Sequence, residues 1–211
     1  MKNFFVILFT LGVTCALLFV FRKPIDKILL PYLKVKPIKF ILMKIALLTQ
    51  PNFVGNVKSM CAELRPDADW LPQAMIDCFY IESSLNPSAV CKYPLDKPTR
   101  ATGLIQFMPE TAIDLGTTVE ELVKMSASEQ LVWVKKYFTT ANRHVEKWNE
   151  MIDVYLSIFY PVAVGQGDDY QFNLSVSHAN KGYDVNGDGV VTIGEIKQVL
   201  KKHLSYVDVS I

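Results

Sequence analysis

The sequence predicts a mostly α-helical protein. Apolar residues recur at helical spacing in several segments, two segments carry helix-capping boxes, and no convincing alternation of apolar and polar residues indicates a strand. Half of the 211 residues are hydrophobic and the net charge is +1. This composition excludes a disordered chain and gives no global signature of nucleic-acid binding, so no nucleic-acid partner is expected.

Residues 1–24 are predicted to form a transmembrane anchor. An apolar run extends from Phe4 to Phe21, which at about 1.5 Å per residue nearly crosses the hydrocarbon core of a bilayer. The run is longer than the apolar core of a cleavable signal peptide, and Arg22-Lys23-Pro24 follows it instead of a small-residue cleavage site. We therefore expect an uncleaved helix that attaches the protein to a membrane.

Residues 25–52 are predicted to be a basic amphipathic linker. Residues 1–50 hold eight Lys or Arg and one Asp, a balance of +7, and the chain totals leave −6 for residues 51–211. The basic part suits an anionic membrane surface, whereas the acidic part resembles an ordinary soluble domain. Residues 38–48 fit a helix lying on the membrane or one packed on the main domain, and the sequence leaves both open.

A carboxylate completes the apolar face of the first helix predicted in the main domain. Leu71, Met75, Cys78 and Glu82 are separated by 4, 3 and 4 residues, which places them on one helix face. Asn86-Pro87 is expected to stop the helix, because proline forces its predecessor out of the α region. A carboxyl half in the core would favour its protonated form, as a general acid requires, although a surface glutamate on a rotated helix explains the pattern equally well.

The later helices are predicted from their starts and stops. Asp69 is expected to cap the first helix, with Pro72 in its first turn. The other expected signals are Pro109 and Gly116 around a short helix, capping boxes at Thr118–Glu121 and Ser126–Glu129, a helix from the second box to about Arg143, and a helix from about Glu146 to Pro161.

Two segments together resemble a known enzyme family. One is Glu82-Ser83-Ser84-Leu85-Asn86-Pro87, and the other contains Gly103-Leu104-Ile105-Gln106, Met108-Pro109 and Thr111-Ala112. The pair is similar to the lytic transglycosylases that have a goose-type or soluble-lytic-transglycosylase (lysozyme-like) domain. The resemblance covers roughly residues 60–165 and is greatest to versions carried by bacteriophages and prophages.

This resemblance implies a lysozyme-like domain at residues 53–175 that acts on peptidoglycan glycan strands. It implies that Glu82 is the catalytic acid/base, that Ser83 and Gln106 line the glycan cleft, and that catalysis needs no cofactor. It also implies that the protein acts in the periplasm or cell envelope and is phage-encoded or virion-associated. The basic residues after the apolar run favour a cytoplasmic C-terminal side, which conflicts with that location.

The family also has an aromatic segment whose tyrosine orients the catalytic carboxylate. The family pattern is Ala-Tyr-Asn-Ala-Gly, whereas this chain has Tyr160 followed by proline. Tyr160 is the best match in sequence and Tyr155 the second choice. Both are retained as candidate substrate-site residues.

The sequence contains no clear second carboxylate for Glu82. Asp77 is the nearest acidic neighbour, but a spacing of five residues turns it away from the face of Glu82. A glycosidase that uses water normally needs two carboxylates, so the pattern favours transglycosylation. The alternatives are a hydrolytic muramidase on the same fold and a non-catalytic peptidoglycan-binding or virion structural protein.

Residues 176–211 are predicted to hold an EF-hand-like calcium loop and a C-terminal helix. The twelve residues from Asp184 to Glu195 place oxygen donors at the positions of an EF-hand loop and a glycine at position 6. With only one such loop, a structural Ca²⁺ is expected rather than a paired sensor, and an empty Asx-rich turn is the alternative. The predicted ligands are Asp184, Asn186, Asp188, the backbone carbonyl of Val190, Thr192 and Glu195.

The cysteines do not indicate a redox compartment. There is no Cys-x-x-Cys pair and no zinc spacing. Cys61, Cys78 and Cys91 form an odd set outside the apolar run, so at most one bridge among them is possible. Buried free thiols are expected.

Overall fold

The computed structural model describes residues 52–91 and 100–204. Within these residues the chain is helical and carries only isolated β-bridges, which confirms the predicted mostly α class. In chain order the elements are α4 (Phe53–Leu64), α5 (Leu71–Ser83), α6 (Pro109–Leu115), α7 (Val119–Leu122), α8 (Ala127–Phe138), η1 (Ala141–Arg143), η2 (Val145–Lys147), α9 (Met151–Phe159), η3 (Pro161–Ala163), α10 (Leu174–Ala179) and α11 (Ile193–Leu204).

The predicted transmembrane anchor at residues 1–24 lies outside the described residues, as does the predicted linker at 25–52 except for Asn52. No helix in the described part of the chain is long and apolar enough to span a bilayer.

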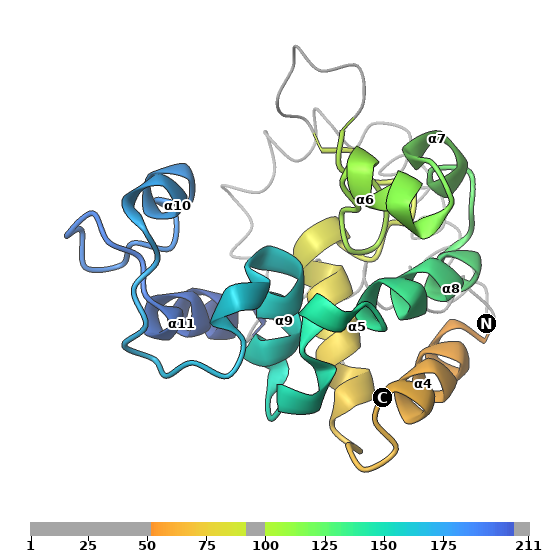
Figure 1. Cartoon of the computed structure of the whole chain (residues 1–211), viewed down its shortest axis with the longest axis horizontal. Helices are drawn as coiled ribbons and strands as arrows, with labels where there is room; N and C mark the ends of the chain where they lie inside the picture. The colour runs from red at the N-terminus through yellow and green to blue at the C-terminus, as the bar shows by residue number, and fades with distance from the viewer. Residues whose placement is uncertain (1–51, 92–99, 205–211) are drawn as a thin grey trace, which may run out of the picture. The chain divides into compact units, whose positions relative to one another are not determined.

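Helix α5 packs against three other helices. It contacts α4, α9 and α11, and Figure 1 shows it between α4 and α9. Leu71, Met75 and Cys78 are fully buried, as their spacing predicts, and Pro72 occupies the first turn. Because α5 is held on several sides, the residues at its C-terminal end have a fixed place.

Both ends of α5 differ from the prediction. Asp69 does not cap the helix, since Trp70 holds the cap position without a side-chain hydrogen bond and Asp69 is exposed. At the other end, Ser84 and Leu85 take left-handed φ values of 54° and 59° and stop the helix before Asn86-Pro87. The turn is stabilised because it buries the Leu85 side chain, which is 2% exposed.

The starts of α6, α7 and α8 follow the predicted signals. Pro109 opens α6, which ends at Gly116 with a φ of 90°. Both capping boxes are present: Thr118 and Glu121 exchange hydrogen bonds at α7, and so do Ser126 and Glu129 at α8. Helix α8 is shorter than predicted: it ends at Phe138 and not at about Arg143.

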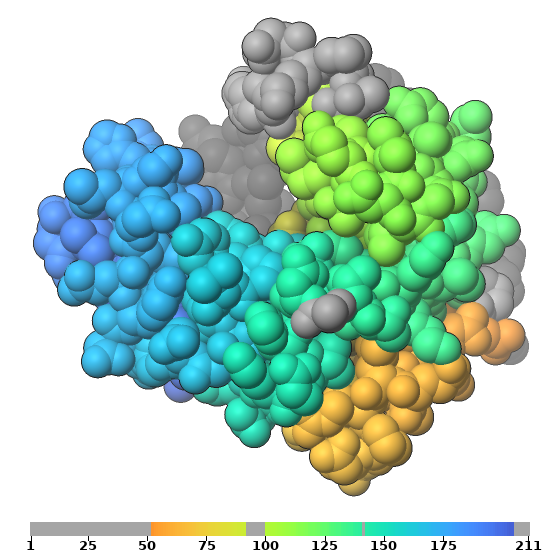
Figure 2. Space-filling view, in the orientation of Figure 1, coloured from red at the N-terminus to blue at the C-terminus, as the bar shows by residue number. Residues whose placement is uncertain are grey.

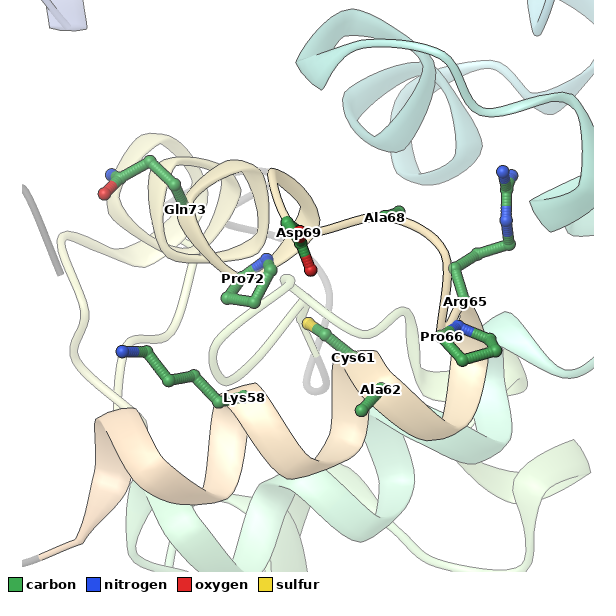
Figure 3. Close-up of a pocket in the computed structure, with 9 residues that line it drawn as sticks. All are labelled: Lys58, Cys61, Ala62, Arg65, Pro66, Ala68, Asp69, Pro72 and Gln73. Atoms are coloured by element: carbon green, nitrogen blue, oxygen red, sulfur yellow. The ribbon is translucent and has the colours of Figure 1, made fainter.

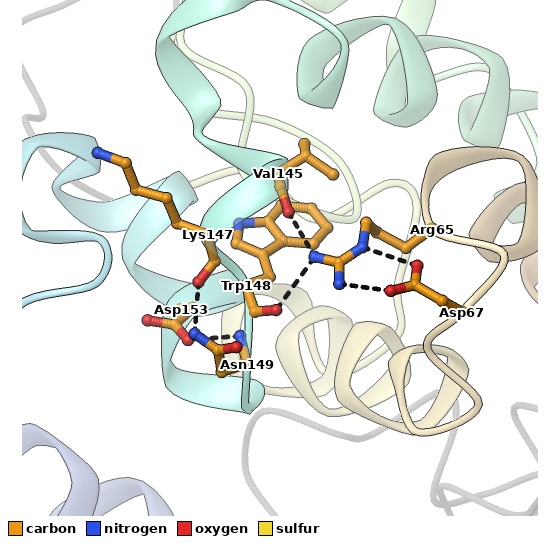
Figure 4. A network of polar contacts seen from close by, with 7 residues as sticks. All are labelled: Arg65, Asp67, Val145, Lys147, Trp148, Asn149 and Asp153. Carbon is orange, nitrogen blue, oxygen red and sulfur yellow. Dashed lines mark hydrogen bonds and ion pairs between the residues drawn. The ribbon is translucent and has the colours of Figure 1, made fainter.

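Helix α9 starts at Met151, later than the predicted Glu146, and a turn fixed by Arg65 precedes it. The Arg65 guanidinium donates to the carbonyls of Val145 at 2.9 Å and Trp148 at 3.1 Å (Figure 4). Trp148 is buried, and its indole donates to the Ser157 hydroxyl at 2.7 Å. The end of α4 therefore holds α9 in register.

Cys61, Cys78 and Cys91 are free thiols in the structure, but only Cys61 and Cys78 are buried as predicted, and Cys91 is half-buried. Cys61 is a buried residue of α4, and Cys78 is a buried residue of α5.

Candidate active site

Glu82 lies at the end of a buried helix face. It is the second-last residue of α5, and it is partly buried where Leu71, Met75 and Cys78 are fully buried. On the face drawn in Figure 2, a recess separates the green surface of α6 from the blue surface of α10, and atoms in the yellow of α5 lie at its floor. Helix α5 thus reaches a hollow in the surface.

The environment of Glu82 favours its neutral form. Burial raises the pKa of its carboxyl from 4.5 to about 7. Among the described residues no hydrogen-bond donor offsets this loss of hydration. A carboxyl with a pKa of about 7 is populated in both protonation states near neutral pH, which suits a group that must give and take a proton.

The predicted second segment folds against the chain that follows Glu82. The Gly103 N–H donates to the Ala89 carbonyl at 2.9 Å, and the Cys91 N–H donates to Ala101 at 2.8 Å. Gln106, with a φ of 52°, donates its side-chain amide to the carbonyls of Gly103 at 2.9 Å and Ala89 at 3.3 Å. Gln106 therefore joins the two predicted segments through backbone contacts.

Gln130, which is not among the residues predicted from the sequence, also joins these segments. Its side chain is fully buried, accepts the Leu104 N–H at 2.9 Å, and donates to Pro87 at 2.6 Å and to Leu122 at 2.7 Å. A Cβ on Gly103 would lie 2.6 Å from the Gln130 oxygen, so this approach requires glycine. The sequence signal that could have identified Gln130 is a polar residue within the apolar face of a predicted helix, as for Glu82.

Ser83 faces inward. It is 8% exposed, and its hydroxyl donates to the Phe79 carbonyl one turn back at 2.8 Å. The structure thus gives the Ser83 hydroxyl a partner inside α5, and donation of its proton to a ligand would require this bond to break.

The structure favours Tyr155 over Tyr160 as the tyrosine near Glu82. Tyr155 is buried in α9, and its pKa is raised by burial and by the charge of Glu82. Tyr160 follows α9, packs its ring on Phe172 at 5.3 Å, and has its hydroxyl 3.5 Å from the Asn173 amide. The second match in sequence is therefore the tyrosine whose pKa the charge of Glu82 raises.

A further tyrosine, which the sequence analysis missed, lies next to Tyr155. The hydroxyls of Tyr155 and Tyr183 are 2.7 Å apart, and the charge of Glu82 contributes to the raised pKa of Tyr183 after burial. Tyr183 is separated from Tyr155 by 28 residues, and no motif marks it. Only the fold brings the two hydroxyls together.

The predicted calcium loop is closed by its own carboxylates. Asp184 accepts the N–H groups of Gly187 at 2.7 Å and Gly189 at 3.0 Å. Glu195, at position 12, reaches back to the N–H groups of Val185 at 3.0 Å and Asn186 at 3.3 Å. The first and last ligand positions of the loop are thereby brought close together, as an EF-hand loop requires.

The oxygen donors of this loop suit Ca²⁺, but in the structure its carboxylates do not converge on one point. Burial opposes ionisation of Glu195, yet the hydrogen bonds from Thr192, Asn186 and Val185 outweigh it and lower the pKa. Asn186 donates to Asp188 at 2.9 Å. In the described part of the chain, no three His, Cys, Asp or Glu side chains gather as metal ligands.

A separate cavity of about 320 Å³ lies between α4 and the start of α5 (Figure 3). Cys61 lies at its wall, and burial raises the pKa of this thiol to about 12, so it is not a nucleophile. Arg65 points out of the cavity toward the turn shown in Figure 4. None of the predicted site residues lines this cavity.

Comparisons with protein-family models, curated proteins and solved structures found no match to this chain. The candidate site therefore stands on its geometry and on the sequence motifs that led to it.

Proposed function

We propose that the protein is a peptidoglycan lytic transglycosylase with Glu82 as its single general acid/base. One observation carries the proposal: Glu82, at the C-terminal end of α5, has a carboxyl whose pKa is raised to about 7 by burial. Carboxyls shifted by burial at the end of a fixed element are found at catalytic sites more often than elsewhere.

The lack of a partner carboxylate supports transglycosylation over hydrolysis. Burial is the cause of the Glu82 shift, and the groups that its charge affects are the Cys78 thiol and tyrosine hydroxyls. Asp77 is half-buried and is held by the Gln73 amide at 2.9 Å. Among the described residues, no other carboxylate contributes to the pKa shift of Glu82, as a closely paired second carboxylate would.

In the proposed reaction, Glu82 acts twice. It first gives its proton to the glycosidic oxygen between N-acetylmuramic acid and N-acetylglucosamine, and the bond from that oxygen to the muramyl C1 breaks. The Glu82 carboxylate then takes the proton of the muramyl 6-hydroxyl as its oxygen bonds to C1. The product is a 1,6-anhydro ring, and Glu82 is protonated again.

A lysozyme-like arrangement of the helices is part of this proposal. Supporting it are a central helix that ends in the acid, a following loop held by Gln106 and Gln130, and a later helix that supplies Tyr155. The proposed place of action is the cell envelope, with the chain held at a membrane by residues 1–24.

We also propose that residues 184–195 hold one structural Ca²⁺. The donors would be the side chains of Asp184, Asn186, Asp188 and Glu195, with the carbonyl of Val190 and with Thr192. The return of Glu195 to the start of the loop supports this proposal.

Mass spectrometry of digested peptidoglycan tests the enzyme proposal. Anhydro-muropeptides are the expected products, and Glu82→Gln should reduce their formation by at least about 1,000-fold, because the acid and the base are lost together. Asp77→Asn on the same helix is the matched control and should retain activity. Products with reducing muramic acid would indicate a muramidase instead, and equal activity of wild type and Glu82→Gln would overturn the mechanism.

A further inference from the structure

The Arg143 guanidinium is a half-buried cation without an acidic partner among the described residues. Acids near it in the sequence have partners of their own. Glu146 lies 3.5 Å from Nδ1 of His144, and the Asp153 carboxylate accepts the Asn149 N–H at 2.8 Å. A guanidinium keeps its charge near neutral pH, and removing a charge from water costs free energy unless an anion or hydrogen bonds compensate it. The charge of Arg143 thus lacks a compensating anion within the described chain.

The contacts of this guanidinium leave one of its nitrogens open. Its central carbon lies over the Tyr137 ring, 3.9 Å from the centroid. Nη1 donates to the Ser157 carbonyl at 3.5 Å, a long hydrogen bond, and that carbonyl also accepts the Tyr137 hydroxyl at 3.1 Å. In the described part of the chain, Nε is the one buried side-chain nitrogen or oxygen without a hydrogen-bond partner. Nη2 makes no hydrogen bond to a described residue and is not enclosed, so an outside acceptor can reach it.

Ring contacts connect Arg143 to the second segment of the candidate site. The Tyr137 ring, which lies under the guanidinium, meets the Phe107 ring edge-on with centroids 6.0 Å apart. Phe107 directly follows Gln106, and its N–H donates to the Thr102 carbonyl at 2.8 Å. Two ring contacts therefore join the cation to the loop that the family resemblance assigns to the glycan cleft.

We propose that Arg143 binds a carboxylate of the peptidoglycan strand and so distinguishes muramic acid units from neutral sugars. The inference rests on the proposed function. N-acetylglucosamine is uncharged, whereas the lactyl group of N-acetylmuramic acid ends in a carboxyl. In strands that carry peptides this carboxyl is an amide, and the free carboxylates lie on the peptide. Charge-assisted hydrogen bonds from a guanidinium to a carboxylate are among the strongest polar contacts in proteins.

Binding measurements with three ligands of matched length test this assignment. The full-length Glu82→Gln protein in detergent is titrated with a neutral N-acetylglucosamine oligomer, with glycan strands freed of peptide, and with strands that carry peptide. Arg143→Met in this background should weaken binding of carboxylate-bearing strands about tenfold and leave the neutral oligomer unchanged, because a charge-assisted bond is lost. A loss with the peptide-free strands assigns the lactyl carboxylate, and a loss confined to peptide-bearing strands assigns a peptide carboxylate.

Two further variants separate recognition of charge from folding. Arg143→Lys keeps the cation and should retain most of the affinity for carboxylate-bearing strands. Lys147→Met removes a nearby exposed cation and is the matched control, which should bind all three ligands as the parent protein does. Equal weakening of neutral and charged ligands by Arg143→Met, or a change that follows only its melting temperature, would show a structural role and overturn the proposal. Unchanged binding would overturn it as well.

A spectroscopic measurement needs no turnover. In the ¹⁵N-labelled full-length protein, the Nε–H signal of Arg143 is assigned by its absence in Arg143→Lys. Carboxylate-bearing strands should shift this signal and the neutral oligomer should not, so a signal that both ligands or neither ligand moves contradicts the assignment. Anhydro products together with Arg143-independent binding would overturn this inference alone. Arg143-dependent binding without anhydro products from the unmutated chain would overturn the proposed function alone.

Discussion

Burial of the Glu82 carboxyl lowers the stability of the folded protein as the pH rises. Its pKa is about 7 in the folded chain and 4.5 in an exposed state, so between these values the folded form binds more protons than the unfolded form. Folding stability is unaffected below pH 4.5, falls between pH 4.5 and 7, and is reduced by roughly 3 kcal/mol above pH 7.

Glu82→Gln should therefore stabilise the protein at high pH. Glutamine stays neutral, so the variant avoids the cost of a buried charge, and its melting temperature at pH 8 should exceed that of wild type by several degrees. At pH 4 the two proteins should melt together, as measured by calorimetry. An equal difference at both pH values would mean that packing, and not charge, explains it.

The same pKa sets the expected pH dependence of activity. The proposed first step needs Glu82 protonated, so cleavage of glycan strands should fall about tenfold for each pH unit well above 7. No second carboxylate must be ionised, so activity should stay level just below pH 7. A bell-shaped profile with a second acidic limb would indicate the two-carboxylate chemistry of a muramidase.

At the scale of elements, Gln130 connects α8 to both segments of the site. Gln130→Leu removes a donor and an acceptor and leaves the Leu104 N–H and the carbonyls of Pro87 and Leu122 without their partner. A loss of about 2–4 kcal/mol in the free energy of unfolding is expected. Gln198→Leu on the exposed side of α11 is the matched control and should change stability by less than about 0.5 kcal/mol.

Denaturant unfolding measures both variants, and cleavage assays at low temperature show the effect on the site. Gln130→Leu should lose activity even where it is fully folded, because the chain after Glu82 and the Gln106 segment lose the link that Gln130 makes between Pro87 and Leu104. Full activity in a folded Gln130→Leu protein would show that these segments need no link through α8.

Calcium should stabilise the loop element. If Ca²⁺ binds only the folded chain, a concentration about 100 times its Kd adds about 2.7 kcal/mol and raises the melting temperature by several degrees. Glu195→Ala should abolish this response, whereas Asp169→Asn, which removes an exposed acid outside the loop, should keep it. No shift in wild type would mean that the loop is a turn without metal.

Some helix ends could be predicted from local sequence signals, whereas others depend on burial or on distant contacts. The capping boxes at Ser126 and Thr118 depend on residues three apart, and the structure has both. Asp69 was expected to act in the same way, but the start of α5 is set by burial of Leu71. The start of α9 depends on a contact from Arg65, some 80 residues earlier, which no local pattern reveals.

At the scale of the whole molecule, charge is divided along the chain. The balance of +7 in residues 1–50 and −6 in the remainder should keep the acidic part away from anionic lipid while the basic part binds it. The full chain should sediment with membranes in high salt. A chain that begins at residue 25 should be released by salt, and sedimentation of this shorter chain in high salt would contradict an anchor at residues 1–24.

The site shows the same limit of sequence reasoning across long distances. Glu82 and Gln106 could be proposed from the sequence because each lies in a short motif. Tyr183 and Gln130 were not, because their roles depend on partners brought from distant parts of the chain. The choice between Tyr155 and Tyr160 likewise required the structure, which places Tyr155 inside α9 and Tyr160 just after its end.

The burial of two thiols bears on where such a chain can work. Burial raises the pKa of Cys61 to about 12 and that of Cys78 well above its usual range, so neither forms an appreciable amount of thiolate at neutral pH. Oxidants and disulfide-exchange catalysts react with the thiolate. Once folded, the domain can therefore persist in an oxidising compartment with both thiols reduced.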